Sequence, residues 1–131
     1  MTRAALPRLL LIDDEPALAD YLADAARISG YEPVTARGEV EFQAFLKAGP
    51  DMVAIDLGMP GMDGVELLRY LAAEKFTGPV LIISGFDRRI LESAFRYGQT
   101  LGLNMTGPLE KPTRLEDIEQ LLASLKPQLV P

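Results

Sequence analysis

Short apolar runs that alternate with longer amphipathic stretches are the feature of this sequence that most limits its fold. The runs are too short for buried helices, and they suit strands that are covered on both faces. Three of them are clear, one is weaker, and a fifth is expected before Lys111. In chain order they lie at Arg8–Ile12, Pro33–Ala36 (the weaker one), Met52–Ile55, Val80–Ile83 and within Asn104–Leu109.

Between these runs, apolar residues recur at spacings of three and four, which is typical of helices packed on a sheet. Helices are expected at about residues 15–29, 40–48, 64–75 and 113–125, with one more after Asp87, which would cap it. Gly30 would end the first helix, and a capping box at residues 113–116 would begin the last. One face of the first helix would carry Leu18, Tyr21, Leu22 and Ala25, and the third helix would bury Val65, Leu68, Leu71 and Ala72. The fourth helix carries Ile90, Leu91, Ala94 and Phe95, and the last would turn Ile118, Leu121 and Leu122 inward. Five strand–helix pairs predict an α/β fold with a doubly wound parallel sheet and helices on both faces.

Length and composition exclude several classes of protein. The 131 residues suit one domain, taken as residues 1–125, with 126–131 as a tail or the start of a linker to a missing output domain. The formal charge of −6 disfavours nucleic acid and anionic membranes as direct partners. Because the chain has no Cys and no His, a thiolate nucleophile, an imidazole base and a cysteine zinc site are excluded. With no signal-peptide pattern and no long apolar run, a cytoplasmic location is expected.

Polar residues stand at the ends of four of the five expected strands. The first strand ends on Asp13 and Asp14, the third on Asp56, the fourth on Ser84, and the fifth just before Lys111. In a doubly wound sheet, ligands bind beyond the carboxyl ends of the strands. We therefore expect these five residues to meet in one crevice.

Three carboxylates in one crevice repel one another. Two unit charges 4 Å apart repel by about 4 kcal/mol at an effective dielectric near 20. A divalent cation removes this penalty, and a site with oxygen ligands alone favours Mg²⁺ over zinc or copper. Lys111 could neutralise one oxygen of an incoming phosphoryl group, and the Ser84 hydroxyl could donate to another, with Gly85 leaving space beside it.

Four segments, taken together, resemble the receiver domains of two-component response regulators. They are Leu11-Ile12-Asp13-Asp14-Glu15-Pro16, Asp56-Leu57-Gly58-Met59-Pro60-Gly61-Met62-Asp63-Gly64, Ser84-Gly85 and Lys111-Pro112. The resemblance extends from about Arg8 to Leu125. It implies a flavodoxin-like sheet with the strand order 2-1-3-4-5.

The resemblance also implies roles for these residues. Asp56 would be the phosphoacceptor, with Lys111 and Ser84 as the other catalytic residues. The ligands of Mg²⁺ would be Asp13, Asp14, Asp56 and the Gly58 carbonyl. The Lys111–Pro112 peptide would be cis.

The implied function is that of a signalling switch rather than of an enzyme that turns over a substrate. A sensor histidine kinase or histidine phosphotransfer protein would supply the phosphoryl group to Asp56, and hydrolysis would reset the switch. Mutation of Asp56 to Asn is expected to abolish phosphorylation and to raise thermal stability by relieving repulsion. A homodimer is left open.

The match departs from the family at Pro108. Three positions before the lysine, the family usually has an aromatic residue that turns inward when the switch hydroxyl engages phosphate, and proline cannot do so. The segment from Ser84 to Lys111 is also longer than is usual in the family. These departures, together with residues 107–112, are similar to receivers that are joined to cyclic-di-GMP phosphodiesterase output domains. The signal is expected to leave through a shift of the fourth helix and the loop after it.

Each residue also has a simpler interpretation when it is considered alone. Asp13 and Asp14 could cap a helix, the Ser84 hydroxyl could hydrogen-bond to the backbone, and Lys111 could be a solvated surface charge.

A degenerate receiver that serves only as an interaction module is one alternative function. A phosphatase of the haloacid dehalogenase type lacks its second acid, because Gly58 stands there, and a flavin protein lacks a Ser/Thr-rich phosphate loop.

Overall fold

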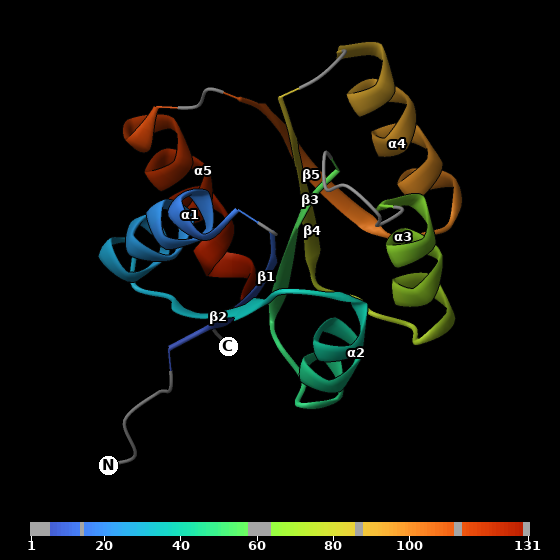
Figure 1. Cartoon of the computed structure of the whole chain (residues 1–131), viewed down its shortest axis with the longest axis horizontal. Coiled ribbons are helices and arrows are strands. Elements are labelled where there is room, and N and C mark those ends of the chain that lie inside the picture. The colour runs from blue at the N-terminus through green and yellow to red at the C-terminus, as the bar shows by residue number, and fades with distance from the viewer. Residues whose placement is uncertain (1–5, 14, 58–63, 86–87, 112–113, 130–131) are drawn as a thin grey trace.

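A computed structural model describes residues 6–13, 15–57, 64–85, 88–111 and 114–129. Five strands alternate with five helices, as expected from the sequence (Figure 1). In chain order they are β1 (Arg8–Ile12), α1 (Pro16–Ile28), β2 (Glu32–Ala36), α2 (Glu39–Lys47), β3 (Met52–Asp56), α3 (Gly64–Ala73), β4 (Pro79–Ser84), α4 (Arg88–Thr100), β5 (Asn104–Glu110) and α5 (Leu115–Leu129).

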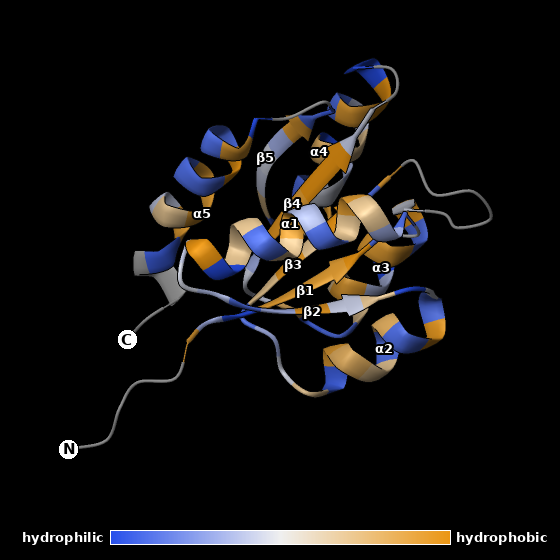
Figure 2. Ribbon diagram, turned by 60° about the vertical axis from the view of Figure 1, so that its left-hand side comes forward, coloured by the Kyte–Doolittle hydropathy of each residue, from blue (hydrophilic) through white to orange (hydrophobic). Residues whose placement is uncertain are grey.

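The strands form one parallel sheet in the order β2-β1-β3-β4-β5, which confirms the doubly wound, flavodoxin-like topology. Alternate residues of a strand point to opposite faces. In β1, Leu10 and Ile12 join a core beneath α2, α3 and α4, whereas Leu9 and Leu11 join a core beneath α1 and α5. Figure 2 shows the apolar strands of the sheet, in orange, between helices in which apolar and polar residues alternate. Burial on both faces explains why the central strands read as continuous apolar runs.

Two helices present a slightly different face to the sheet from the one that the sequence predicts. In α1, Tyr21 is exposed, because the buried face runs through Ala19, Leu22, Ala23 and Ala26. In α4, Ile90 is 57% exposed, because the buried face runs through Leu91, Ala94 and Gly98. Tyr21, which the spacing groups with Leu18 and Leu22, therefore lies outside the core, and so does Ile90.

The buried face of α3 and the end of α5 also differ from the predictions, whereas the end of α1 agrees. In α3, Leu67 is fully buried, while Val65 and Ala72 are only half-buried. Gly30 ends α1 with a φ of +86°, as expected for a glycine at this position. The helix α5 continues to Leu129, four residues further than predicted. The caps expected from Asp87 and Thr113 lie outside the described residues.

Strand β5 contains a bulge at Gly107 and Pro108. Leu81 pairs with Thr106, and Ile83 pairs with Leu109, so β5 has one more residue than β4 between these pairs. Gly107 has a φ of +83°, and the Gly107–Pro108 peptide is cis. Since proline has no N–H to donate, it is tolerated at a bulge and in an edge strand such as β5.

Candidate functional site

Three polar side chains are buried at the carboxyl ends of neighbouring strands. Asp13 follows β1, Asp56 ends β3 and Ser84 ends β4, and these residues are 2%, 3% and 1% exposed. Because β1, β3 and β4 are parallel and adjacent, their carboxyl ends lie at one edge of the sheet. The tertiary structure thus brings together residues that are far apart in the sequence, as predicted from the strand ends.

Lys111 reaches the same edge from β5. Its Nζ donates to Asp56 Oδ2 at 2.8 Å, and the lysine side chain is 19% exposed. The Lys111 backbone N–H donates to the Ser84 carbonyl at 2.9 Å, which joins the end of β5 to that of β4. The prediction that Lys111 would lie in the crevice, rather than at the surface, is consistent with this ion pair.

Gly85 provides room for the lysine side chain. A Cβ atom at this position would lie 3.3 Å from Lys111 Cβ and 3.5 Å from Lys111 Cδ. A larger residue would therefore press on the stem of Lys111, whose ammonium group must reach Asp56. This close approach agrees with the space that the sequence predicted beside Ser84.

Asp13 is the least satisfied acid of the site. Its Oδ1 accepts a hydrogen bond from the Glu15 N–H at 2.9 Å, but its buried Oδ2 has no hydrogen bond to any residue that the structure describes. Burial, with a smaller contribution from the nearby Asp56 carboxylate, raises the pKa of Asp13 to about 6. A buried carboxylate oxygen without a donor, next to a second carboxylate, is suited to a hard cation such as Mg²⁺.

The complete set of cation ligands is not defined by the structure. Asp14 and Gly58, which the resemblance assigns to the metal, lie outside the described residues. Within residues 6–13, 15–57, 64–85, 88–111 and 114–129, no group of three acidic, His or Cys side chains is close enough to hold a metal. The described part of the site therefore supplies Asp13 and Asp56, and the roles of Asp14 and Gly58 stay predictions. The cis peptide expected at Pro112 also lies outside the described residues.

An ion pair beside the site was not expected from the sequence. Arg88, in the first turn of α4, donates from Nε and Nη2 to Glu110 Oε1 at 3.0 and 2.9 Å. Glu110 is the β5 partner of Ser84 in the sheet and precedes Lys111. The pair joins the start of α4 to the end of β5. Twenty-one residues separate Arg88 from Glu110 in the sequence, so no local pattern indicates this contact.

An apolar recess of about 450 Å³ adjoins Lys111 on the side of α1 and α5. Leu18, Leu22, Ile83, Leu109 and Ile118 contribute to its walls. The sequence placed several of these side chains in the core but did not predict a recess.

In the part of the chain that the structure describes, no helix is long and apolar enough to cross a membrane.

Comparison with known proteins identifies the family. Residues 9–123 match the family described as "Response regulator receiver domain". The positive alginate biosynthesis regulatory protein of Pseudomonas aeruginosa is 31% identical over 118 residues, which cover 87% of this chain and 45% of that protein. The transcriptional regulatory protein TrcR of Mycobacterium tuberculosis is 35% identical over 81 residues, or 61% of this chain and 32% of that protein. The chain thus spans less than half the length of these curated relatives.

The solved structures agree with the fold and with the family. A response regulator from Colwellia psychrerythraea matches with a TM-score of 0.81 and 29% identity, over 94% of this chain and 98% of that one. The chemotaxis response regulator CheY4 of Vibrio cholerae matches with a TM-score of 0.74 at 22% identity, which shows a shared fold. The strand order and the acidic edge agree with the family match over residues 9–123. The chain belongs to the receiver domains of two-component response regulators.

Proposed function

We propose that this receiver domain accepts a phosphoryl group on the Asp56 carboxylate from a phosphohistidine of a sensor histidine kinase or histidine phosphotransfer protein. One observation carries the proposal. Asp56 is buried at the carboxyl edge of the sheet, with Lys111 Nζ at 2.8 Å and the buried carboxylate of Asp13, whose pKa is raised, beside it. The 131 residues contain no His, which fits a recipient whose phosphohistidine donor lies outside this domain.

The Asp56 carboxylate acts as the nucleophile. One of its oxygens forms a bond to phosphorus while the phosphorus–nitrogen bond of the phosphohistidine breaks, and the imidazole nitrogen keeps the electron pair. Lys111, which pairs with the Asp56 carboxylate before the reaction, stays protonated and pairs with a phosphoryl oxygen afterwards, and the Ser84 hydroxyl donates to another phosphoryl oxygen. Later attack of water releases phosphate and restores the carboxylate, so the domain is a switch rather than a substrate-turnover enzyme.

Asp13, Asp14, Asp56 and the Gly58 carbonyl are the residues that would hold Mg²⁺. The bound ion would supply positive charge that offsets the charge of the carboxylates and of the incoming phosphoryl group. Asp13 Oδ2, which lacks a donor among the described residues, supports this assignment.

The apolar recess next to Lys111 provides a surface where the donor protein could contact the domain. The family supports a histidine kinase as the partner, whereas the output stays a proposal. Because the chain covers less than half of its curated relatives, the output could lie in a further domain. A cyclic-di-GMP phosphodiesterase domain is our proposal for it, from the resemblance around Pro108.

A phosphotransfer assay tests the proposed function. Incubation with acetyl phosphate or a phosphorylated donor, with Mg²⁺ present, should add one phosphoryl group to the intact mass. Asp56→Asn should accept none, and a chelator should abolish labelling of the wild type. An Asp56→Asn protein that still accepts label would move the acceptor elsewhere. A folded wild type that never accepts label would favour a degenerate receiver that serves only in protein interaction.

A further inference from the structure

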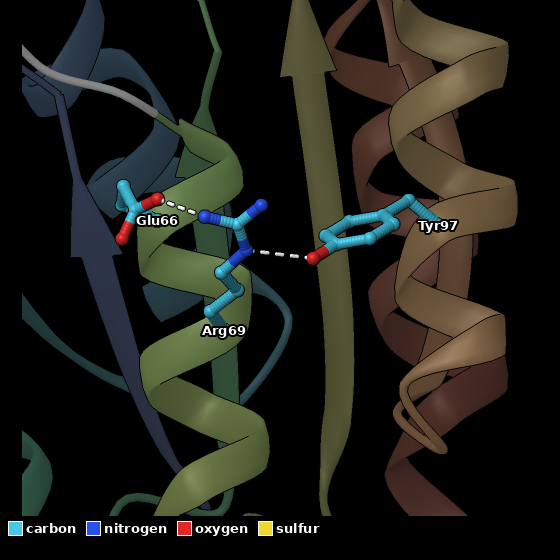
Figure 3. Close-up of polar contacts among 3 residues, drawn as sticks. All are labelled: Glu66, Arg69 and Tyr97. Atoms are coloured by element: carbon cyan, nitrogen blue, oxygen red, sulfur yellow. Dashed lines mark hydrogen bonds and ion pairs between the residues drawn. The ribbon is translucent and has the colours of Figure 1, made fainter.

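A polar contact joins α3 to α4 on the face of the sheet opposite α1 and α5. Arg69 Nε donates to the Tyr97 hydroxyl at 2.7 Å, and the Arg69 guanidinium carbon lies 5.7 Å from the centre of the Tyr97 ring. Arg69 Nη1 also donates to Glu66, one turn earlier in α3. Figure 3 shows the tyrosine extending from α4 toward the arginine, with Glu66 on the far side of the guanidinium. We call the Arg69–Tyr97 contact the α3–α4 tie.

The helix α3 is linked mechanically to the phosphoacceptor. Leu57 follows Asp56 directly and packs on Gly64, the first residue of α3. A Cβ atom on Gly64 would lie 2.4 Å from Leu57 Cδ2, so the two residues are in close contact. A displacement of Leu57 would therefore press on the start of α3 through this contact.

The helix α4 is linked to the other polar groups of the site. It begins at Arg88, four residues after Ser84, and Arg88 is paired with Glu110 beside Lys111. A change in the position of Ser84 or Lys111 therefore acts on the start of α4. The α3–α4 tie connects these two helices directly. It joins α3, whose first residue contacts Leu57, to α4, whose first residue pairs with Glu110.

The helix α4 packs on the sheet through Leu91, Ala94 and Gly98, which are buried. Phe95 and Tyr97 are partly buried against the same core. The Tyr97 ring therefore belongs to the apolar contact of α4, and its hydroxyl makes the exposed polar contact with α3.

The tie occurs together with a direct contact between Lys111 and the Asp56 carboxylate. When Asp56 is phosphorylated, its carboxyl group loses its own charge, and Lys111 must pair with a phosphoryl oxygen instead. We propose that the α3–α4 tie is a restraint that favours the carboxylate form of the site and opposes the phosphorylated form. The inference rests on the proposed function, and it assigns Arg69 and Tyr97 a regulatory role outside the acceptor site.

Removal of one oxygen atom tests the restraint. Tyr97→Phe removes the hydroxyl of the tie and keeps the ring, and Arg69→Met removes the donors and keeps an aliphatic chain of similar length. Tyr70→Phe is the matched control, because the Tyr70 hydroxyl bonds at 3.2 Å to Oε1 of Glu74, the residue after the end of α3, and not to a residue of α4. Beryllofluoride with Mg²⁺ serves as the probe of the phosphorylated form. Its binding is followed by isothermal titration, since the chain has no tryptophan for fluorescence.

We expect Tyr97→Phe and Arg69→Met to bind beryllofluoride about fivefold more tightly than the wild type, a factor at the low end of ordinary coupling between sites. Tyr70→Phe should bind as the wild type does. Hydrogen exchange without beryllofluoride should be faster in α4 of the two tie variants and unchanged in the control. Urea unfolding confirms that each variant is folded.

The outcomes separate the restraint from the proposed function. Equal affinity in the wild type, Tyr97→Phe and Arg69→Met would overturn the restraint and leave the proposed function intact. A gain in affinity that Tyr70→Phe shares would overturn it too, because the effect would not depend on the link to α4. If the folded wild type binds no beryllofluoride with Mg²⁺, the proposed function itself fails, and the restraint falls with it.

Discussion

At the scale of single residues, the two buried acids of the site have different electrostatic environments. Asp56 has Lys111 as a partner, whereas Asp13 has one oxygen without a donor among the described residues. Relief of repulsion is therefore expected more from a change at Asp13 than at Asp56. In Asp56→Asn, loss of the ion pair with Lys111 offsets part of the stabilisation that the sequence predicts.

Asp13→Asn should stabilise the metal-free domain at pH 7. The pKa of Asp13 is raised from 3.8 to about 6 in the folded state, so the folded state binds the proton more tightly than the unfolded state does. The stabilisation from the protonated acid is complete below pH 3.8 and is lost as pH rises through 6. Two pKa units correspond to about 3 kcal/mol, and coupling to Asp56 makes about 1–3 kcal/mol the range to expect.

Urea unfolding in the presence of a chelator measures this effect. The gain of Asp13→Asn over the wild type should be largest at pH 7 and should shrink toward pH 4.5, where the wild-type acid is mostly protonated. A gain that does not depend on pH would contradict the raised pKa of Asp13.

At the scale of elements, α4 and β5 approach closely at one glycine. A Cβ atom on Gly98 would lie 2.3 Å from Met105 Sδ and 2.8 Å from Met105 Cγ. In an open helix, a change from Gly to Ala stabilises by about 0.5–1 kcal/mol. Here the crowding against Met105 opposes that gain, so Gly98 sets how close α4 lies to the sheet.

Gly98→Ala should therefore destabilise the domain. Overpacking typically costs about 1–3 kcal/mol, which exceeds the gain in helix propensity. In a Met105→Ala background the obstacle is absent, so the same substitution should become neutral or stabilising. A double-mutant cycle from thermal unfolding measures the coupling between the two positions. Destabilisation by Gly98→Ala that is equal in both backgrounds would show that Met105 is not the obstacle.

The sequence predicts the helices but not which face of each helix is buried against the sheet. Spacing in the sequence identified all five helices, but it grouped Tyr21 and Ile90 with residues that are buried, whereas both are exposed. An apolar stripe defines a face only to within about one residue, which is about 100° on a helix. The buried faces instead include the small residues Ala23 and Gly98, which an apolar stripe of large side chains does not reveal.

At the scale of the whole molecule, the parallel sheet brings Asp13 and Asp56 to one edge, and the Mg²⁺ that we propose to bind there would be linked to folding. The ion should stabilise the domain by about 1.4 kcal/mol at ten times its dissociation constant. For a domain of this length, that corresponds to a rise in Tm of roughly 4 °C.

Thermal unfolding with and without millimolar Mg²⁺ checks this prediction. The shift should disappear in Asp13→Asn, which remains folded but lacks one ligand. Equal amounts of Na₂SO₄ control for ionic strength. A melting curve that Mg²⁺ leaves unmoved in the wild type would contradict the metal assignment.

The sequence by itself determined the alternation of strands and helices, the parallel sheet, and the identity of the polar residues at the strand ends. These properties follow from local periodicity and from the rule that parallel strands end at one edge. The resemblance to receiver domains extended this to the strand order, which the sheet confirms.

Only the tertiary structure decided which of these polar groups touch and how the helices are held. The ion pair of Lys111 with Asp56, the unsatisfied oxygen of Asp13, and the contacts Arg88–Glu110 and Arg69–Tyr97 depend on side-chain positions in space. The residues of the three pairs are 55, 22 and 28 positions apart. Local patterns extend over only a few residues, so contacts across these separations are set by the packing of the elements.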